Sequence, residues 1–355
     1  MLSNEETVSN PFFPDCPVCD LEPLPENSKP EYHLHKGLRW VRPYYFSYRA
    51  NAKLRWLNRP LIEVMEEQFF NREPGYWENR IKQGFVTVNG ETKQPCHVIN
   101  DRGGVDVIRH RTLRLEEPVL DQLPVVIGET DQFVAINKPS SLPCHPGGRF
   151  NFNTLEKILQ HVLCQKGLRL AHRLDRVTSG VLIYAKKKEG ANVFRELLIS
   201  NSLSKTYIAL VDGCFPADET TCTALISEPG PPPLFQRKGI EEGEGEGQTA
   251  KTVMTRLWTN DKKSIVACQP ITGRCHQIRI HLKFLGHPIA NDLLYNDSLN
   301  LGYDASDPRF MEIYLHAIRY SGKQFDFRAP SPPWLDDLGD DVRAIVLKGL
   351  EELWD

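Results

Sequence analysis

The chain has 355 residues, of which 40% are hydrophobic and 25% are charged, and its formal net charge is -3. This composition is ordinary for a globular protein, and the length allows two domains or one large domain with an accessory module. No apolar run approaches the roughly 20 residues that a membrane-spanning helix needs, so we expect no membrane partner.

The cysteines and the first residues bear on the cellular compartment. Most of the nine cysteines lie inside apolar or strand-like runs, and no secretory signal is recognisable. They therefore predict reduced, partly buried thiols rather than a disulfide framework. Because residues 1–30 lack both a signal-peptide core and the Arg-rich character of a transit peptide, we expect a cytoplasmic or nuclear protein rather than a mitochondrial one.

Residues 1–30 contain six prolines and little hydrophobic periodicity, which predicts a loosely ordered tail. Within this tail, Cys16 and Cys19 have a spacing suited to zinc, and the only nearby partners are His33 and His35. A zinc knuckle is one interpretation of this pattern. We favour the other, a tail that carries two thiols.

Residues 31–57 form a lead-in to a small module over residues 58–115. Apolar spacing predicts helices at residues 60–69 and 76–82, and residues 84–90 (Gly-Phe-Val-Thr-Val-Asn-Gly) predict a strand that ends in an Asn-Gly turn. This order of elements resembles the S4-type RNA-binding module. A generic α/β extension is the alternative.

From residue 120 to residue 330 the chain alternates short strands and helices, as expected for a mixed α and β domain. The pattern predicts strands within 125–136 and at 181–186 and 206–211, and helices at 154–165, with Thr154 as N-cap, and 190–200. Residues 228–248 are rich in Pro, Gly and Glu and predict a mobile insertion. Residues 331–355 form an acidic C-terminal segment.

A run of nine residues, 172–180, reads His-Arg-Leu-Asp-Arg-Val-Thr-Ser-Gly and places Asp175 in a loop directly before an apolar strand. Three later segments accompany it: Lys205-x-Tyr207-x-Ala209, Thr272-Gly273-Arg274-Cys275-His276-Gln277-Ile278-Arg279 and Leu315-His316-Ala317. These motifs, in this order, resemble the RluA-type pseudouridine synthases over roughly residues 120–330. The resemblance implies an α+β fold with a mixed, mostly antiparallel sheet.

The resemblance also implies roles for three residues. Asp175 would act on the ribose of a target uridine, either by attack on C1′ or by assisting elimination. Arg279, expected in an alternating strand, would supply the charge that keeps this carboxylate ionised, because burial alone favours the protonated acid. Tyr207 would pack against the uracil and take part in proton transfer. The reaction is an isomerisation, so we expect no metal ion and no cofactor.

Five further residues are candidate RNA contacts. A uridine in folded RNA must be flipped out at a cost of a few kcal/mol, and the resemblance implies that the flat cationic side chain of Arg173 occupies the vacated stack. Lys138, His145 and Arg274 are expected to bind phosphate or to position loops, and His276 to lie in the cleft.

The sequence therefore predicts a monomeric RNA pseudouridine synthase, with the tRNA anticodon stem-loop favoured over ribosomal RNA. An inert RNA-binding or assembly factor on the same scaffold is the alternative, but a degenerate member would be expected to lose Asp175, Tyr207 or Arg279. A second, deaminase-like activity is disfavoured, since no histidine is followed two positions later by glutamate.

Overall fold

The structure is a computed structural model that describes residues 16–69, 72–100, 105–230, 236–241, 243–299 and 311–355. The described chain divides into two compact units. With those gaps, unit 1 comprises residues 16–33 and 41–116, and unit 2 comprises residues 34–40 and 117–355. Within the described ranges, no helix is both long enough and apolar enough to cross a membrane.

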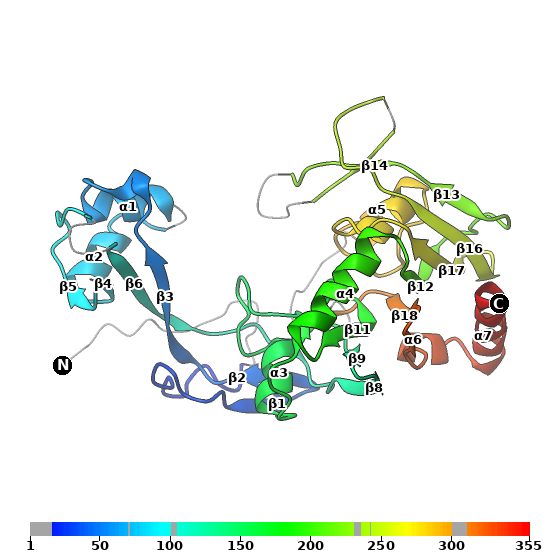
Figure 1. Ribbon diagram of the computed structural model, residues 1–355, viewed down its shortest axis with the longest axis horizontal. Coiled ribbons are helices and arrows are strands. Elements are labelled where there is room, and N and C mark those ends of the chain that lie inside the picture. The colour runs from blue at the N-terminus through cyan, green and yellow to red at the C-terminus, as the bar shows by residue number, and fades with distance from the viewer. Residues whose placement is uncertain (1–15, 70–71, 101–104, 231–235, 242, 300–310) are drawn as a thin grey trace. The chain divides into compact units, whose positions relative to one another are not determined.

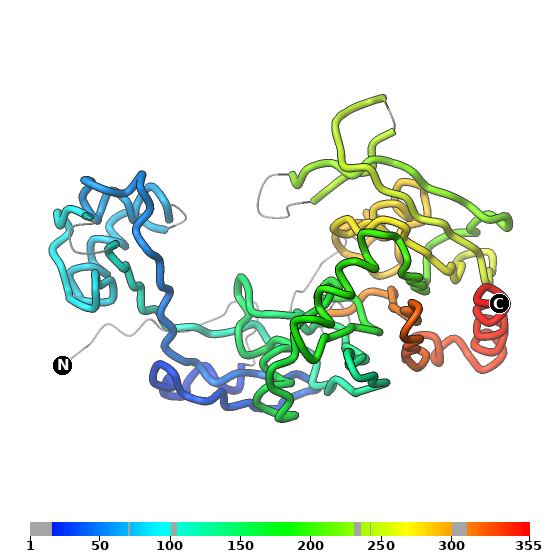
Figure 2. Tube along the Cα trace, in the orientation of Figure 1, coloured from blue at the N-terminus to red at the C-terminus, as the bar shows by residue number. Residues whose placement is uncertain are grey.

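Unit 1 is an antiparallel sheet against which two short α-helices and a 3-10 turn pack. Its residues 41–116 lie in the blue-to-cyan part of the trace in Figure 2, which also contains residues 34–40 of unit 2. The strand order is β3-β6-β4-β5, with β3 at Tyr44–Asn51, β4 at Val86–Val88, β5 at Glu91–Thr92 and β6 at Val107–Arg114. The helices are η1 (Leu54–Trp56), α1 (Leu61–Gln68) and α2 (Tyr76–Lys82). Both predicted α-helices are confirmed, because their apolar positions enclose one core around Trp56, Met65 and Trp77.

The tail and the lead-in are more ordered than predicted, although residues 1–15 lie outside the described residues. Val18 is fully buried, and Leu24 exchanges backbone hydrogen bonds with the start of β3. Strand β3 lies within the predicted lead-in but pairs along its whole length with β6. The module therefore begins before residue 58, and local sequence did not reveal this because the partner strand lies about sixty residues away.

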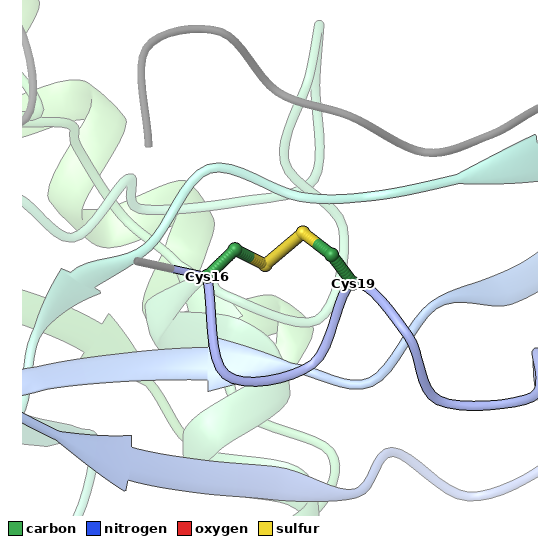
Figure 3. The surroundings of a disulfide bond; sticks show 2 residues. All are labelled: Cys16 and Cys19. Carbon is green, nitrogen blue, oxygen red and sulfur yellow. A yellow bond between two sulfur atoms is a disulfide. The ribbon is translucent and has the colours of Figure 1, made fainter. Parts of the chain in front are cut away.

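Cys16 and Cys19 form a disulfide across a tight turn (Figure 3). The expectation that every cysteine is reduced is therefore wrong for this pair, while the other seven are free. The turn brings the two Cα atoms to 5.6 Å, within disulfide reach. Disulfide sulfurs are not thiolate ligands, so the zinc-knuckle interpretation fails in this structure.

Unit 2 is organised around a ten-stranded sheet (Figure 1). Eight of its strands follow the order β13-β16-β17-β12-β18-β11-β9-β8, and the other two pair at the side, β10 with β11 and β19 with β18. Its strands are β8 (Val125–Glu129), β9 (Phe133–Lys138), β10 (Arg169–Leu170), β11 (Ser179–Ala185), β12 (Ser204–Asp212), β13 (Thr220–Cys222), β16 (Thr252–Thr259), β17 (Lys263–Pro270), β18 (Leu315–Gly322) and β19 (Phe325–Arg328). The β11–β18 pair is parallel and the others are antiparallel. The mixed, mostly antiparallel sheet is thus confirmed.

Five helices accompany this sheet: α3 (Leu155–His161), α4 (Lys188–Ile199), α5 (Gln277–Phe284), α6 (Pro333–Asp336) and α7 (Asp340–Trp354). The hydroxyl of Thr154 accepts from the backbone N–H of Lys157 and caps α3 as predicted. Helix α4 packs on β10 and β11, and a 3-10 turn, η2 (Asp297–Leu299), lies after α5.

The acidic C-terminal segment is part of unit 2 rather than an appendage. Trp334, Leu335, Val346 and Leu350 are buried against apolar residues of the sheet such as Ile208. The acidic side chains of α7 lie on its other, exposed face. Composition alone concealed this, because a charged face and a buried face alternate along one helix.

Two small sheets complete the fold. Strands β1 (Tyr32–His35), β2 (Leu38–Val41) and β7 (Val119–Leu120) form one, and β14 (Leu225–Ile226) with β15 (Gly239–Ile240) forms the other. Strand β15 lies inside the predicted mobile insertion, so part of that stretch has regular structure. Residues 231–235 and 242 of the insertion lie outside the described residues.

Candidate active site

Asp175 lies in the loop that leads into β11, at the point where β11 pairs with β18. The carbonyl of Asp175 accepts from the N–H of Thr178, which closes a turn before the strand begins. Gly180, with φ of 107°, allows the two strands to meet, since a Cβ there would stand 2.3 Å from the carbonyl oxygen of Ala317. The glycine at the end of the motif is thus required by close backbone approach. The side chain of Asp175 is 22% exposed, within reach of a ligand.

A buried guanidinium faces this carboxylate. Arg279 Nη1 donates to Asp175 Oδ2 at 3.3 Å, and its Nε and Nη2 donate to the two oxygens of Asp292 at 2.6 and 2.7 Å. Burial opposes the charge on Arg279, but the hydrogen bonds and charge of Asp292, with the charge of Asp175, raise its pKa above the ordinary value. Arg279 therefore stays cationic, and Asp292 fixes its orientation.

The expectation of a strand around Arg279 is wrong, because this residue lies in helix α5. The alternation of apolar and polar residues suggested a period of two. In the structure all residues from 277 to 282 are buried, so the polar side chains carry no helical periodicity. His276 precedes the helix in a left-handed conformation, with φ of 56°.

His276 lies between the side chains of Tyr295 and Asp175. Its Nδ1 shares a hydrogen bond with the hydroxyl of Tyr295 at 2.8 Å, and its Nε2 lies 3.7 Å from Asp175 Oδ2. Burial lowers the pKa of His276 more than the charge of Asp175 raises it. A neutral imidazole beside the carboxylate can hydrogen-bond a ligand without competing with Arg279 for Asp175.

Tyr207 comes from β12, at a bulge in its pairing with β18, and is 8% exposed. Its hydroxyl shares a hydrogen bond with the hydroxyl of Tyr320. Burial raises the pKa of Tyr207 above the ordinary value and the hydrogen bond with Tyr320 only partly offsets this, so the phenol remains protonated at neutral pH. The ring of Tyr320 in turn stacks on His172, with centroids 4.6 Å apart.

Most of these side chains line one cleft of about 300 Å³, whereas Asp292 and Tyr295 are not among its lining residues. The catalytic candidates Asp175, Tyr207 and Arg279 all line it, and so do the RNA-contact candidates Arg173, Arg274 and His276. Arg173 and Arg274 are exposed, as residues that meet a large polyanion must be. Lys205 also lines the cleft.

Of the two roles expected of Lys138, phosphate binding and loop positioning, its surroundings suit the second. It is fully buried, and its ammonium donates to the carbonyls of Pro139, Leu142 and Arg176 at 2.8 to 3.1 Å. Burial lowers its pKa to about 8. Lys138 therefore ties the strand β9 to the Asp175 loop from within. His145 is exposed but is not among the residues that line the cleft.

Sequence reasoning missed three residues that complete the site: Asp292, Tyr295 and Tyr320. Asp292 ends the segment Ala290-Asn291-Asp292, and nothing in this local sequence indicates that its carboxylate is buried against Arg279. Tyr320 belongs to the strand that begins with Leu315-His316-Ala317. Strand alternation alone could not reveal its bond to Tyr207.

Comparisons with known proteins agree with this geometry. Residues 132–284 match the family model described as RNA pseudouridylate synthase. The chain is 40% identical over 319 residues to the mitochondrial tRNA pseudouridine(32) synthase of Saccharomyces cerevisiae, covering 87% of this chain and 66% of that protein. It is 35% identical over 360 residues to RNA pseudouridine synthase 7 of Arabidopsis thaliana, covering 87% and 89%.

Human pseudouridylate synthase RPUSD2 is 38% identical over 265 residues, which are 75% of this chain but 47% of that protein. The chain thus spans about half the length of this relative. Among solved structures, human RNA pseudouridylate synthase domain containing 1 superposes with a TM-score of 0.50 at 24% identity, covering 63% of this chain and 89% of that one, which supports the fold.

The expectation of a cytoplasmic or nuclear location is wrong, since the yeast relative, aligned over 87% of this chain, is a mitochondrial protein by name. The composition of the first 30 residues was an insufficient guide, because targeting depends on the pattern of a segment rather than on its average charge.

Proposed function

This chain belongs to the RluA-type pseudouridine synthases, and we propose that it isomerises uridine to pseudouridine in a structured RNA. The observation that carries the proposal is the cleft of unit 2, where Asp175 meets the cationic Arg279 beside the aromatic ring of Tyr207. These are the groups that a reaction at C1′ of a flipped nucleotide requires.

Each side chain supports one part of the reaction. Arg279 holds Asp175 ionised and oriented, so the carboxylate can attack C1′ or assist the departure of uracil. Tyr207 presents a protonated phenol and a flat ring to the base. Arg173, exposed at the edge of the cleft, stacks in the gap that the flipped uridine leaves. We propose that the protein acts as a monomer and, because the reaction is an isomerisation, without a cofactor.

The substrate we propose is tRNA, at the anticodon stem-loop, inside mitochondria. Two yeast relatives support this choice: the mitochondrial tRNA pseudouridine(32) synthase and the tRNA pseudouridine(31) synthase, which is 33% identical over 75% of this chain. Ribosomal RNA is the second candidate, since ribosomal large subunit pseudouridine synthase C of Salmonella typhi is 32% identical over 61% of this chain.

Unit 1 is proposed to be an S4-like RNA-binding module. Its two short helices, packed on strands that meet at an Asn89-Gly90 turn, support this assignment. Residues 41–116 of this unit carry 13 lysines and arginines against 9 aspartates and glutamates, an excess that suits a phosphate backbone.

The test uses the full chain and a tRNA transcript with uridine in the anticodon loop. Pseudouridine formation is measured by carbodiimide-stalled reverse transcription, with Asp175→Asn and the exposed control Asp218→Asn beside the wild type. We expect turnover by the wild type and the control and none by Asp175→Asn, with RNA affinity changed less than about threefold because phosphates and stacking hold the RNA. Binding without turnover by the wild type would support an inert RNA-binding factor instead.

A further inference from the structure

Unit 1 contains a cavity that the proposed reaction does not use. Its volume is about 560 Å³, larger than the roughly 300 Å³ of the active-site cleft. It lies between the strands β3 and β6 and the helices α1 and α2. Its lining residues are Tyr48, Arg49, Ala50, Met65, Gln68, Phe69, Arg72, Trp77, Ile108 and His110.

The cavity has an apolar floor and an aromatic mouth. Trp77 and Ile108 are buried, whereas Tyr48 and Phe69 are 47% and 41% exposed. The Tyr48 ring lies nearly parallel to the ring of His110, its cross-strand partner, at an angle of 22°. Half-exposed flat rings beside a hydrophobic hollow are the surface on which nucleobases stack.

Positive charge surrounds this mouth. The guanidinium of Arg72 lies 4.9 Å from the ring centroid of Tyr76, and that of Arg114 lies 5.8 Å from the ring centroid of Tyr48. None of the described residues that line the cavity is acidic. A neighbouring hollow shares Phe69 and Arg72 but is also lined by Glu66 and Glu73, so an anionic ligand is directed to the first cavity.

His110 adds a polar group inside the cavity. It is 8% exposed, and its Nε2 lies 3.4 Å from the hydroxyl of Tyr76. Burial, and then the charges of Arg80 and Arg72, lower the pKa of His110 to about 4. The imidazole is therefore neutral at pH 7, and a neutral imidazole can donate to or accept from the edge of a base.

We propose that this cavity binds the base of an unpaired nucleotide of the RNA, stacked on Tyr48 and Phe69, with the adjoining phosphates near Arg72 and Arg114. The inference rests on the proposed function, which makes RNA the macromolecule that unit 1 meets. An aromatic side chain of a protein would also suit the rings, but it would bring no negative charge to Arg49 and Arg72, the exposed arginines that line the cavity. A nucleotide satisfies both features.

The test measures binding of labelled hexaadenylate and of an abasic hexamer of ribose phosphate to the full chain by fluorescence anisotropy. Adenine is used because it is not the base that the active site acts on. The variants are Tyr48→Ala, Tyr48→Phe and the control Leu54→Ala, whose side chain is 87% exposed in the same unit outside the cavity. We expect the wild type to prefer hexaadenylate about tenfold, as one stacked base allows.

Tyr48→Ala should reduce this preference to about twofold or less and leave the abasic affinity nearly unchanged, because it removes a stacking ring but no cation. Tyr48→Phe and Leu54→Ala should keep the preference. An unchanged preference in Tyr48→Ala, or an equal loss for both oligomers, overturns the inference. A photo-crosslink from azidoadenosine hexamer to the wild type gives a second readout: attachment only outside the residues of this cavity also overturns it.

Pseudouridine formation is assayed on the same preparations, which separates the two proposals. An active wild type without Tyr48-dependent base preference contradicts the cavity inference alone. A wild type with that preference but without turnover contradicts the proposed reaction and leaves the cavity as an RNA site.

Discussion

Asp292 is predicted to act as a positioning residue for Arg279, and Asp292→Asn tests this. The side chains of Arg279 and Asp292 are 6% and 1% exposed and share two charge-assisted hydrogen bonds. Asparagine has nearly the same shape, but it removes the negative charge and one of the two acceptors. Asp175, at 3.3 Å, is then the remaining carboxylate partner of Arg279 among the described residues.

The magnitude follows from burial. Removal of one partner of a buried ion pair costs about 3–5 kcal/mol of unfolding free energy. Because asparagine retains one acceptor oxygen, we expect the lower end, about 3 kcal/mol. The guanidinium also loses the bidentate contact that orients it, and a displacement of about 1 Å at a reacting site costs about 10²-fold in rate. We therefore expect a loss of pseudouridine formation of that order with RNA affinity unchanged.

The assays are single-turnover pseudouridine formation, urea unfolding and RNA binding, each with Asp297→Asn as control. The carboxylate of Asp297 is 78% exposed and pairs with Lys283 at the surface, so its loss should cost less than about 1 kcal/mol and no rate. A wild-type rate for Asp292→Asn would refute the positioning role. A lost rate together with lost RNA binding would point to disruption of the cleft rather than of Arg279 alone.

Three other predictions concern stability. Burial lowers the pKa of His316 to about 3, so below pH 6.5 the unfolded chain binds more protons than the folded chain. Between pH 7 and pH 5, unit 2 should therefore lose about 2 kcal/mol of unfolding free energy from this residue. Urea unfolding at both pH values measures this loss, and an equal loss in His316→Asn contradicts it. Tyr207→Phe and Tyr320→Phe should each lower the unfolding free energy by about 1–3 kcal/mol, because each leaves one buried hydroxyl unpaired. A double variant that loses the full sum of the two single losses would disprove an energetic coupling between these two hydroxyls. Gly180→Ala should cost more than about 3 kcal/mol, since its Cβ would overlap the Ala317 carbonyl, whereas Gly147→Ala, with open space around it, should unfold like the wild type.

The sequence allowed the secondary structure around the site to be predicted where hydrophobic periodicity is strong. Helix α4 and strands β9 and β11 begin and end within about two residues of their predicted positions. Helix α5 was predicted as a strand because its apolar and polar residues alternate. In the structure its first six residues are all buried, so no exposed polar face marks the helical period. The extent of unit 1 was also missed, since β3 is defined by its distant partner β6.

For the active site, the motifs predicted which residues gather but not how their side chains point. Asp175, Tyr207 and Arg279 share the cleft as expected. Lys138, which the sequence shows only as a cation beside a loop, turns inward to three carbonyls instead of outward to phosphate. The two hydrogen bonds from Arg279 to Asp292 depend on the burial of both residues, which no pattern in a single sequence encodes.

The parallel pairing of β11 with β18 also constrains when the candidate site of unit 2 can form during synthesis. Ser179 Oγ bonds to Nδ1 of His316, a residue 137 positions later in the chain. A ribosome that has just completed the Asp175 loop therefore exposes a nascent chain whose neighbouring strand does not yet exist. Contacts this distant in sequence form slowly, and α6 and α7, which cover the same sheet, emerge later still. The Asp175 loop should thus stay unformed, and open to chaperones, until β18 (Leu315–Gly322) has also been synthesised.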